Sequence, residues 1–583
     1  MSTASSKPGA TRVWGIDLGT TNSVIAQLVD GKAVPIAIDG SAIVPSIVLF
    51  HEDGSVVVGR PARNLELVHP ERALRSAKRK IGTDHRYVVP LAAGARSLSP
   101  EEVSAEVLRA LKQGAEASTG VAVDDVVITV PAYFDDAQRR ATLKAGELAG
   151  LNVLRLLNEP TSAALVYEQA GLGAAGGSQT LLVYDLGGGT FDVSVLDVFE
   201  GIREVKATAG NTHLGGDDFD DLLLRMFVDR LRIESAVDVT ADARAMARLR
   251  RLAEDTKIKL STDTEARVRE EFIATSRPSE AGGAGTAVHL DLELDRTTLE
   301  DLLLPLISST IELSRRAVRD AGLEPESIDA ICLVGGSTRI PLVRRLLADA
   351  FEAEVHEEID PDLAVGLGAA VQAGLLKGVA VERILVDVAA HTLGIRAVGE
   401  LDDFEQAEDP DTFAAVLRRN TALPAERAEM FATVVNNQPR IEVTVFQGEH
   451  PRCSQNTRVG SFTFPLVPAP AHNPVRCSFA YDLNGIIRVH VKQMGTDNEK
   501  TVAMTVADAS APSVTVDDDD VQQAIAAPGA VERRARKLLE RPEFAQRAEL
   551  LHLLDVYLGA RAAERQDAED ALLDFFFEVE AEG

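Results

Sequence analysis

Apolar residues in the first part of the chain gather in short continuous runs, with stretches of helical spacing between them. Runs such as Val126–Val130, Leu181–Tyr184 and Ile331–Val334 have the length and continuity of strands buried on both faces. Ala243–Leu260, in contrast, repeats its apolar residues at the period of a helix. This alternation predicts an α/β fold class for residues 12–380.

The pattern changes beyond residue 388. Arg440–Phe446 and Ile486–Val491 alternate polar and apolar residues, and turn signals such as Asn484-Gly485 separate such runs. This predicts an antiparallel β domain with one polar face, followed by helical spacing near the end. We expect four parts: an α/β domain over residues 1–381, a short apolar connector over 382–387, the β domain over 388–510 and a short helical tail over 511–583.

The charge of the chain restricts its partners. Among 583 residues, 60 Lys and Arg stand against 90 Asp and Glu, for a net charge of -30. Such an acidic excess repels polyphosphates and anionic lipids, so we expect neither nucleic acid nor membrane as a partner. The three cysteines have no paired spacing, and no run approaches the ~20 apolar residues needed to cross a bilayer. We therefore expect a cytoplasmic protein.

One segment of the chain occurs twice. Gly15–Ser23 recurs as Tyr184–Ser194, each with a strand, an Asp, a tip of Gly and Thr, and a second strand. That order is typical of a β-hairpin with a glycine-rich tip. Two unrelated glycine turns are the alternative, but the repeated order of elements argues against coincidence. Two related lobes that face each other would bring the two tips together around a cleft.

The residues of these tips favour nucleotide binding. Gly187, Gly188 and Gly189 present backbone N–H groups and have no Cβ, so phosphate oxygens can approach closely. Hydroxyls and carboxylates accompany them: Thr20, Thr21, Thr190, Asp17, Asp185 and Asp192. The carboxylates would repel phosphate unless a metal ion lay between, and Mg²⁺ prefers carboxylate oxygen, retained water and phosphate. An ordinary tight turn explains one such hairpin, but not two with matching acids.

Motifs from two domains together resemble one family. They are Gly15–Ser23, Tyr184–Ser194, Asn158–Pro160, Val334–Pro341, Leu393–Ile395, Arg419–Thr421 and Asn437–Pro439. In this order they look like the seventy-kilodalton heat-shock chaperones of the DnaK type. The resemblance covers residues 12–507, and it is specific because motifs from two domains occur in the family's order. The first hairpin alone is weaker evidence, since actin and sugar kinases share it.

The resemblance implies an actin-like ATPase domain of two related lobes, followed by an antiparallel β-sandwich that binds peptides and by a short, lid-like helical tail. ATP, or ADP after hydrolysis, would lie with Mg²⁺ in the central cleft. Position by position, Asp17 and Asp192 would hold Mg²⁺ through water, and Lys78 would reach the γ-phosphate. Glu159 would position the metal shell and the attacking water, and Thr190 would relay the proton of that water.

The resemblance also assigns the remaining nucleotide contacts. They are Thr20, Thr21, Asn22, Asp185, Gly187, Gly188, Gly189, Gly215, Gly216, Glu254, Lys257, Ser261, Gly335, Gly336, Ser337, Arg339 and Asp362. Without the resemblance, the residues themselves favour a surface position for Lys78 and for the pair of Glu254 and Lys257. Lys78 lies in a basic cluster typical of an exposed helix end, and Glu254 and Lys257 have the spacing of a surface ion pair. Ile258 stands where some relatives carry Arg, which would weaken stacking on adenine.

The β domain would bind extended apolar peptides through strand-like backbone bonds and a hydrophobic pocket. Matching positions are Ile395, Val398, Phe431, Val434, Ile441, Val443 and Val475. Alternation along the strands fits a second interpretation equally well, in which all of these side chains belong to the core of the domain.

The function that follows is an ATP-dependent chaperone that binds short extended hydrophobic segments of unfolded proteins. ATP hydrolysis would switch its affinity for these clients. A J-domain co-chaperone and a nucleotide-exchange factor are the implied partners, and we expect a monomer. Alternatives are a chaperone dedicated to few clients, as in iron–sulfur cluster assembly, and an ATP-binding adaptor with little turnover. A small-molecule kinase is disfavoured by the attached β domain.

Three departures from the family pattern stand out, of which the first bears on contacts with nucleotide-exchange partners and the other two on peptide binding. The stretch between Gly82 and Ser99 is short, residues 398–415 insert an acidic loop near the peptide groove, and the tail after 511 barely resembles a full lid. We therefore expect weak or fast peptide binding, or a narrow set of clients.

Overall fold

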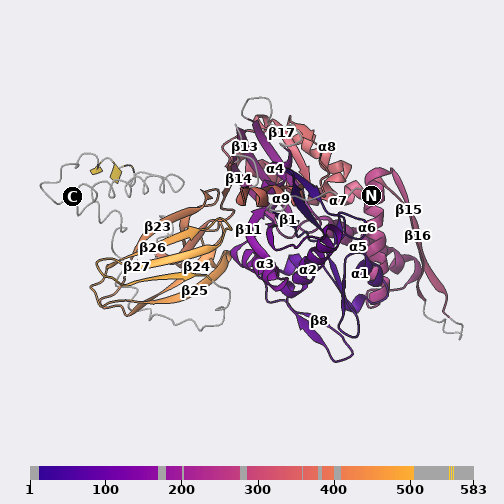
Figure 1. Cartoon of the computed structure of the whole chain (residues 1–583), viewed down its shortest axis with the longest axis horizontal. Coiled ribbons are helices and arrows are strands. Elements are labelled where there is room, and N and C mark those ends of the chain that lie inside the picture. The colour runs from indigo at the N-terminus through magenta and orange to yellow at the C-terminus, as the bar shows by residue number, and fades with distance from the viewer. Residues whose placement is uncertain are drawn as a thin grey trace. The chain divides into compact units, whose positions relative to one another are not determined.

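The computed structural model describes residues 12–167, 179–199, 202–275, 285–356, 359–378, 384–399 and 409–504, with positions 550, 551, 553, 554 and 556. The chain forms two compact units, each described by itself (Figure 1). The first comprises residues 1–392, 418–425 and 481–486, and the second comprises residues 393–417, 426–480 and 487–583. Of the tail expected over 511–583, the described positions are helical, and the rest lies outside the described residues.

Two sheets of the same design form the first unit. One has the strand order β11-β10-β1-β2-β3, and the other has the order β18-β17-β12-β13-β14 before it continues into β19 and β22. In each sheet the hairpin strands are antiparallel and the next two strands are parallel. The strands are β1 (Trp14–Asp17), β2 (Asn22–Val29), β3 (Lys32–Pro35), β10 (Asp125–Val130), β11 (Asn152–Asn158), β12 (Gln179–Leu186), β13 (Phe191–Phe199), β14 (Ile202–Asn211), β17 (Ala330–Val334) and β18 (Glu354–His356). The predicted internal repeat is therefore confirmed, strand by strand.

Helices pack against these sheets, against the smaller sheets and against one another. They are α1 (Arg60–Leu65), α2 (Pro100–Thr119), α3 (Asp136–Leu148), α4 (Glu159–Tyr167), α5 (Gly216–Ser235), α6 (Ala243–Thr262), α7 (Arg296–Asp320), α8 (Pro341–Ala350) and α9 (Ala364–Leu376). Each sheet has its own core: Trp14 and Phe134 are fully buried in the first, and Tyr184 and Phe227 in the second. Because α4 and α9 are apolar all round, they are buried helices rather than amphipathic surface helices.

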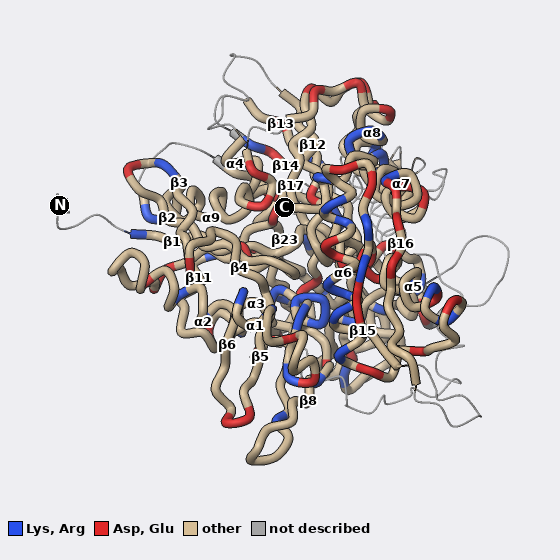
Figure 2. Tube along the Cα trace, turned by 90° about the vertical axis from the view of Figure 1, so that its right-hand side faces the viewer, with Lys and Arg blue, Asp and Glu red and all other residues tan. Residues whose placement is uncertain are grey.

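Smaller sheets complete the first unit. They comprise β4 (Val44–Pro45), which pairs with β2, the sheet of β5 (Ile47–Phe50), β6 (Val56–Val58) and β7 (Ala73–Arg75), and the hairpins β8 (Tyr87–Val89) with β9 (Arg96–Leu98) and β15 (Glu265–Thr275) with β16 (Ala287–Asp295). The β8–β9 hairpin is the short stretch between Gly82 and Ser99. Figure 2 shows basic and acidic residues interspersed along β15, where exposed pairs such as Arg267 with Asp291 form across the hairpin.

The connector is a strand of the second sheet. β19 (Ile384–Val388) pairs in parallel with β14 and, on its other side, with β22 (Ala422–Leu423). Its Asp387 is buried, accepts a 2.9 Å hydrogen bond from Asn158 Nδ2, and has a raised pKa because burial disfavours the charged form. The first unit thus holds the connector by backbone bonds and by one buried carboxylate.

The second unit contains two four-stranded antiparallel sheets, in the orders β21-β20-β24-β25 and β23-β26-β27-β28. Their strands are β20 (Leu393–Gly399), β21 (Asp409–Leu417), β23 (Ala425–Ala432), β24 (Arg440–Gln447), β25 (Thr457–Pro465), β26 (Pro474–Tyr481), β27 (Ile487–Gln493) and β28 (Glu499–Ala503). The expected acidic loop over 398–415 is wrong at both ends, because β20 runs to Gly399 and β21 begins at Asp409. Residues 400–408 lie outside the described residues.

Candidate nucleotide site

The tips of the β1–β2 and β12–β13 hairpins border one cavity of about 660 Å³ in the first unit. That volume is within the range of small-molecule sites, roughly 300–1,000 Å³. Predicted site residues that line it are Asp17, Thr20, Thr21, Asn22, Lys78, Glu159, Asp185, Gly187, Gly188, Thr190, Gly216, Glu254, Lys257, Ser261, Gly335, Gly336, Ser337, Arg339 and Asp362. The remaining predicted residues of this site, Gly189, Gly215 and Asp192, are direct chain neighbours of lining residues or lie on the same hairpin.

The second hairpin tip is packed tightly enough to require glycine. A Cβ at Gly188 would lie 1.8 Å from Thr21 Oγ1, so the two hairpin tips approach each other directly. The start of α5 fixes the same tip, because the backbone N–H groups of Gly216 and Asp217 donate to the carbonyls of Gly187 and Gly188 at 3.0 and 2.7 Å. The Ser337 hydroxyl also donates to the Gly187 carbonyl at 3.0 Å. The tip is therefore rigid before any ligand arrives.

Lys78 is buried, contrary to the exposed position that its basic neighbours indicate. It lies in a short 3-10 helix (Ala77–Lys80), is 5% exposed, and its Nζ lies 2.5 Å from Glu159 Oε1. Glu159 begins α4 directly after β11, so two segments 81 residues apart supply this pair. A buried, paired cation at the cavity can stabilise negative charge that develops on a ligand.

The carboxyl groups around the Lys78–Glu159 pair lie where burial disfavours their charged form. Burial, with Glu159 as the next cause, raises the pKa of Asp17 to about 7 and that of Asp192 to about 7. The same causes raise the pKa of Asp185, and its Oδ2 has no hydrogen-bond partner. Several buried acids around one lysine are what a divalent cation would neutralise. The residues present therefore fit Mg²⁺.

The fit is to a hydrated ion. Within the described part of the chain, no three His, Cys, Asp or Glu side chains lie close enough to hold a metal ion directly. Mg²⁺ usually keeps several waters and is bound through one or two carboxylates beside phosphates. Two of the acids already have fixed orientations: the Thr129 hydroxyl donates to Asp17 Oδ1 at 3.1 Å, and the Tyr133 backbone N–H donates to Asp192 Oδ1 at 3.0 Å.

The far end of the cavity offers groups for a nucleoside. Lys257 Nζ donates to the Gly216 carbonyl at 3.1 Å and pairs with Asp220 at 2.8 Å. Arg339 on the opposite wall is held by Asp362 at 3.0 Å. Ile258 also lines the cavity and is 55% exposed, so it presents an apolar side chain to the space.

Several lining residues were not predicted from the sequence. They include Gly19, Asp217, Asp220, Thr262 and Arg344. Asp217 and Asp220 closely follow the predicted residues Gly215 and Gly216, so the same acidic segment could have identified them. Burial, with opposition from Lys257, raises the pKa of Asp220 to about 6. Arg344 carries no such signal, because only the packing of α8 brings it to the cavity.

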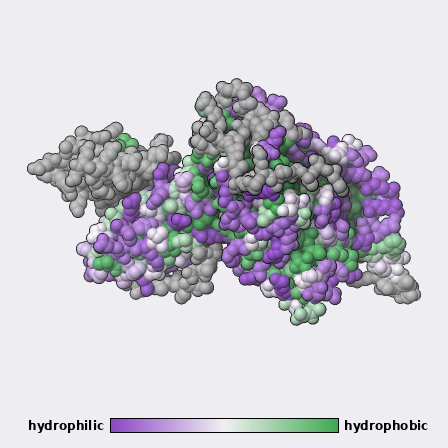
Figure 3. All heavy atoms as spheres, viewed as in Figure 1, coloured by the Kyte–Doolittle hydropathy of each residue, from purple (hydrophilic) through white to green (hydrophobic). Residues whose placement is uncertain are grey.

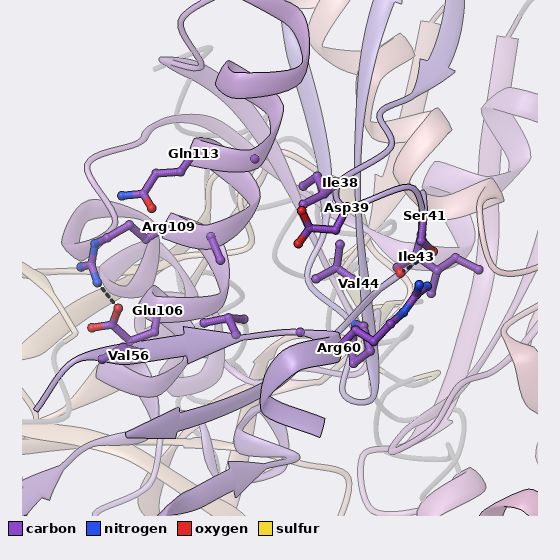
Figure 4. A pocket seen from close by; sticks show the side chains of 15 residues that line it. Ile38, Asp39, Ser41, Ile43, Val44, Val56, Arg60, Glu106, Arg109 and Gln113 are labelled. Carbon is purple, nitrogen blue, oxygen red and sulfur yellow. Dashed lines mark hydrogen bonds and ion pairs between the residues drawn. The ribbon is translucent and has the colours of Figure 1, made fainter. Parts of the chain in front are cut away.

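A second cavity of about 390 Å³ lies elsewhere in the first unit. Figure 4 shows Glu106, Arg109 and Gln113 of α2 on one side of it, with Ile38, Asp39 and Val44 on the other. None of the predicted site residues lines it, and it has no glycine-rich hairpin tip. The chemistry predicted for phosphate therefore belongs to the larger cavity.

The predicted peptide-contact residues are divided between the two sheets of the second unit. Ile395, Ile441 and Val443 lie in the β20–β24 sheet, and Phe431 and Val475 lie in the β23–β26 sheet. Val443 and Val475 are buried, at 3% and 1% exposure, and Ile395 is buried at 6%. Phe431, Val434 and Ile441 are partly exposed, and Val398 lies in β20, where its side chain is not described. The partly exposed set is the better placed for a ligand.

The visible surface of the first unit is largely hydrophilic. Figure 3 shows hydrophilic residues over much of the visible face of the first unit, with apolar residues in smaller groups. Across the residues that the structure describes, no helix is both long and apolar enough to cross a membrane.

The chain is similar to known proteins along most of its length. A model of the family described as Hsp70 protein matches residues 13–570. The proteins named "Chaperone protein DnaK" from Thermotoga neapolitana, Thermotoga petrophila and Thermotoga maritima are each 41% identical to this chain over 546 residues, which cover 92% of this chain and 86% of theirs.

The chain therefore belongs to the Hsp70 family. Membership confirms the fold class expected from the sequence, an actin-like ATPase followed by a β-sandwich. It also makes the protein an Hsp70-type ATP-dependent chaperone, and so an ATPase that acts on polypeptide clients.

Proposed function

We propose that this chain holds Mg-ATP between its two hairpin tips and uses hydrolysis to switch the affinity of its β domain for short, extended, apolar segments of unfolded proteins. The observation that carries the proposal is one cavity lined by both tips, by the Lys78–Glu159 pair and by Asp17 and Asp185, whose pKa values are raised. A structural ATP clamp would need the glycine tips but not a buried lysine among raised-pKa acids.

Each group in the cavity has a proposed role in hydrolysis. Asp17 and Asp192 would hold Mg²⁺ through its water ligands, and Glu159 would orient those waters and the attacking water. Lys78 stabilises charge on the equatorial oxygens, and Thr190 passes on the proton of the water. When bound, Mg²⁺ supplies neutralising positive charge for the phosphates and for the carboxylates around it.

The nucleotide is bound by the remaining cavity residues. The threonines and glycines of both tips donate to the phosphates, while Glu254, Lys257 and Ser261 contact the adenosine from one side. Gly335, Gly336, Ser337, Arg339 and Asp362 form the opposing wall. Ile258 offers apolar contact to the base in place of a stacked guanidinium.

The proposed clients contact Phe431, Val434, Ile441 and neighbouring positions of the β domain. We propose the boundaries 1–381, 382–387, 388–510 and 511–583 for the ATPase domain, connector, β domain and tail. A J-domain co-chaperone and a nucleotide-exchange factor are the proposed partners, and the cytoplasm is the proposed compartment.

The test is single-turnover ATP hydrolysis on the full chain, with and without an extended apolar peptide, alongside peptide affinity in ATP and in ADP. We expect the peptide to accelerate hydrolysis and to bind more tightly in ADP. Val434→Phe should weaken peptide binding and leave basal hydrolysis unchanged. Equal peptide affinity in the two nucleotides would exclude the proposed switch.

A further inference from the structure

The loop that follows β10 contacts Asp192, the proposed metal-shell acid, through a backbone N–H. The Tyr133 N–H donates to Asp192 Oδ1 at 3.0 Å. Gly210 closes the other side of the contact, because a Cβ there would lie 2.8 Å from Asp192 Oδ1 and 3.0 Å from Tyr133 Cβ. Asp192 itself is 1% exposed. With so little free space, the orientation of this carboxylate depends on where the Tyr133 backbone lies.

Three consecutive carbonyls of the same loop are bonded by two side chains. Arg139 donates to the Ala132 carbonyl at 3.0 Å and to the Phe134 carbonyl at 3.1 Å. His391 Nε2 bonds the carbonyl between them, that of Tyr133, at 3.0 Å. The rings of Tyr133 and His391 also meet edge to face, with centroids 4.3 Å apart at 62°. Because a carbonyl oxygen only accepts, Nε2 of His391 must carry the proton.

His391 occupies a distinctive place along the chain. It follows the connector strand β19, which ends at Val388, and precedes Leu393, where the first strand of the second unit begins. It nevertheless belongs to the first unit by its contacts. His391 therefore lies two residues before β20 and also bonds the Tyr133 loop.

We propose that His391 is a positioning residue for ATP hydrolysis: its Nε2–H fixes the Tyr133 peptide and thereby orients Asp192 toward the metal shell. The inference rests on the role proposed above for Asp192. It adds a residue outside the nucleotide cavity, since His391 does not line that cavity.

Two substitutions separate the hydrogen bond from the ring. His391→Phe keeps an aromatic ring but removes the donor, whereas His391→Gln keeps an N–H donor and removes the ring. His85→Phe is the matched control, because His85 also meets a tyrosine edge to face, with centroids 4.5 Å apart, on the exposed β8–β9 side of the molecule.

The experiment measures basal single-turnover hydrolysis at saturating Mg-ATP, ATP affinity and melting temperature on the full chain. We expect His391→Phe to slow hydrolysis about fivefold, the scale of one neutral hydrogen bond, with ATP affinity unchanged. His391→Gln should return the rate to within about twofold of wild type, and His85→Phe should match wild type.

Three results would overturn the proposal: a wild-type rate in His391→Phe, equal slowing in the Phe and Gln variants, or a fall in ATP affinity that parallels the fall in rate. The comparison uses basal hydrolysis only. If peptide fails to stimulate the wild-type chain, the client switch is refuted while the His391 result still stands.

Discussion

The two hairpins that face the nucleotide cavity share a framework but differ in charge. Both carry Asp-Leu-Gly, as Asp17–Gly19 and as Asp185–Gly187, and both are followed by a second antiparallel strand. Across the first hairpin, Asp17 pairs with Val24; across the second, Asp185 pairs with Asp192. Like charges directly opposite each other destabilise a hairpin. The second lobe therefore carries an electrostatic cost that the first avoids, and a bound cation would remove it.

The acids also differ in their partners. Asp17 accepts a hydrogen bond from Thr129, whereas Asp185 Oδ2 is buried without one. The repeated strand order thus places an aspartate at two equivalent positions, and the residues around each aspartate differ. Of the three acids, Asp185 is therefore the one whose carboxylate has a buried oxygen left for a ligand.

Removal of Lys78 should have the largest effect, because this cation faces the acids of both hairpins. We expect Lys78→Ala to slow single-turnover hydrolysis about 10³-fold, the upper scale for loss of one preorganised charge contact. Lys80→Ala is the control, since Lys80 lies in the same 3-10 helix but is exposed. Similar rates in the two variants would contradict the assignment of Lys78 to catalysis.

Threonines at the two tips provide a direct comparison of the hairpins. Thr190→Ala should slow hydrolysis about 10²-fold, because it removes the proposed proton relay. Thr20→Ala should change the rate less than about threefold, since Thr20 offers one binding contact to phosphate. Rapid-quench measurement of the hydrolysis of bound ATP compares the two variants. Equal slowing in both would show that the two threonines have equivalent roles.

The glycines of the Asp-Leu-Gly repeats should respond differently to a methyl group. A Cβ at Gly19 would lie 1.9 Å from the Asn22 carbonyl oxygen, whereas a Cβ at Gly187 meets nothing closer than 3.6 Å. Gly19→Ala should lower the free energy of unfolding by about 1–3 kcal/mol through overpacking. Gly187→Ala should leave stability unchanged but weaken ATP affinity about tenfold, because its methyl group would enter the space for phosphate. Thermal melts and ATP titrations of both variants measure the contrast.

Much of this architecture could be predicted because local sequence patterns indicate it. Continuous apolar runs marked the buried strands, and the repeat of Asp, Gly and Thr marked both hairpins and their acids. The family resemblance then identified the more distant lining residues, such as Lys257 and Arg339, from short motifs. These signals need no knowledge of packing.

What the sequence could not predict depends on contacts between distant segments. The burial of Lys78 comes from Glu159, and its basic neighbours indicated exposure instead. The cross-strand pairing of Asp185 with Asp192 needs the register of the hairpin. The acidic loop was placed too broadly because acidic residues obscured the strand pattern of Asp409–Leu417. His391 lies in no motif, and only the fold brings its ring to Tyr133.

The smallest effect that we predict is also the most specific to the second hairpin. Asp185→Asn should raise the melting temperature of the nucleotide-free, metal-free protein by about 2 °C at pH 7.5, because it removes a buried acid whose pKa burial raises and which lies opposite Asp192. The stabilisation that Mg-ADP adds should shrink in the same variant. Asp17→Asn should raise the melting temperature less, since Thr129 already satisfies that carboxylate.

The pH dependence of the melting temperature sharpens this comparison. Burial raises the pKa of Asp17 and of Asp192 to about 7, so the folded state binds protons that the unfolded state releases near the ordinary value of 3.8. The stability of the nucleotide-free protein must therefore fall as pH rises from about 4 through 7. Asp185→Asn should flatten that fall, because one fewer buried acid then keeps a proton that the unfolded state releases. A steeper fall in the variant, measured by thermal melts across this range, would show that Asp185 is stabilised by protein groups rather than reserved for a cation.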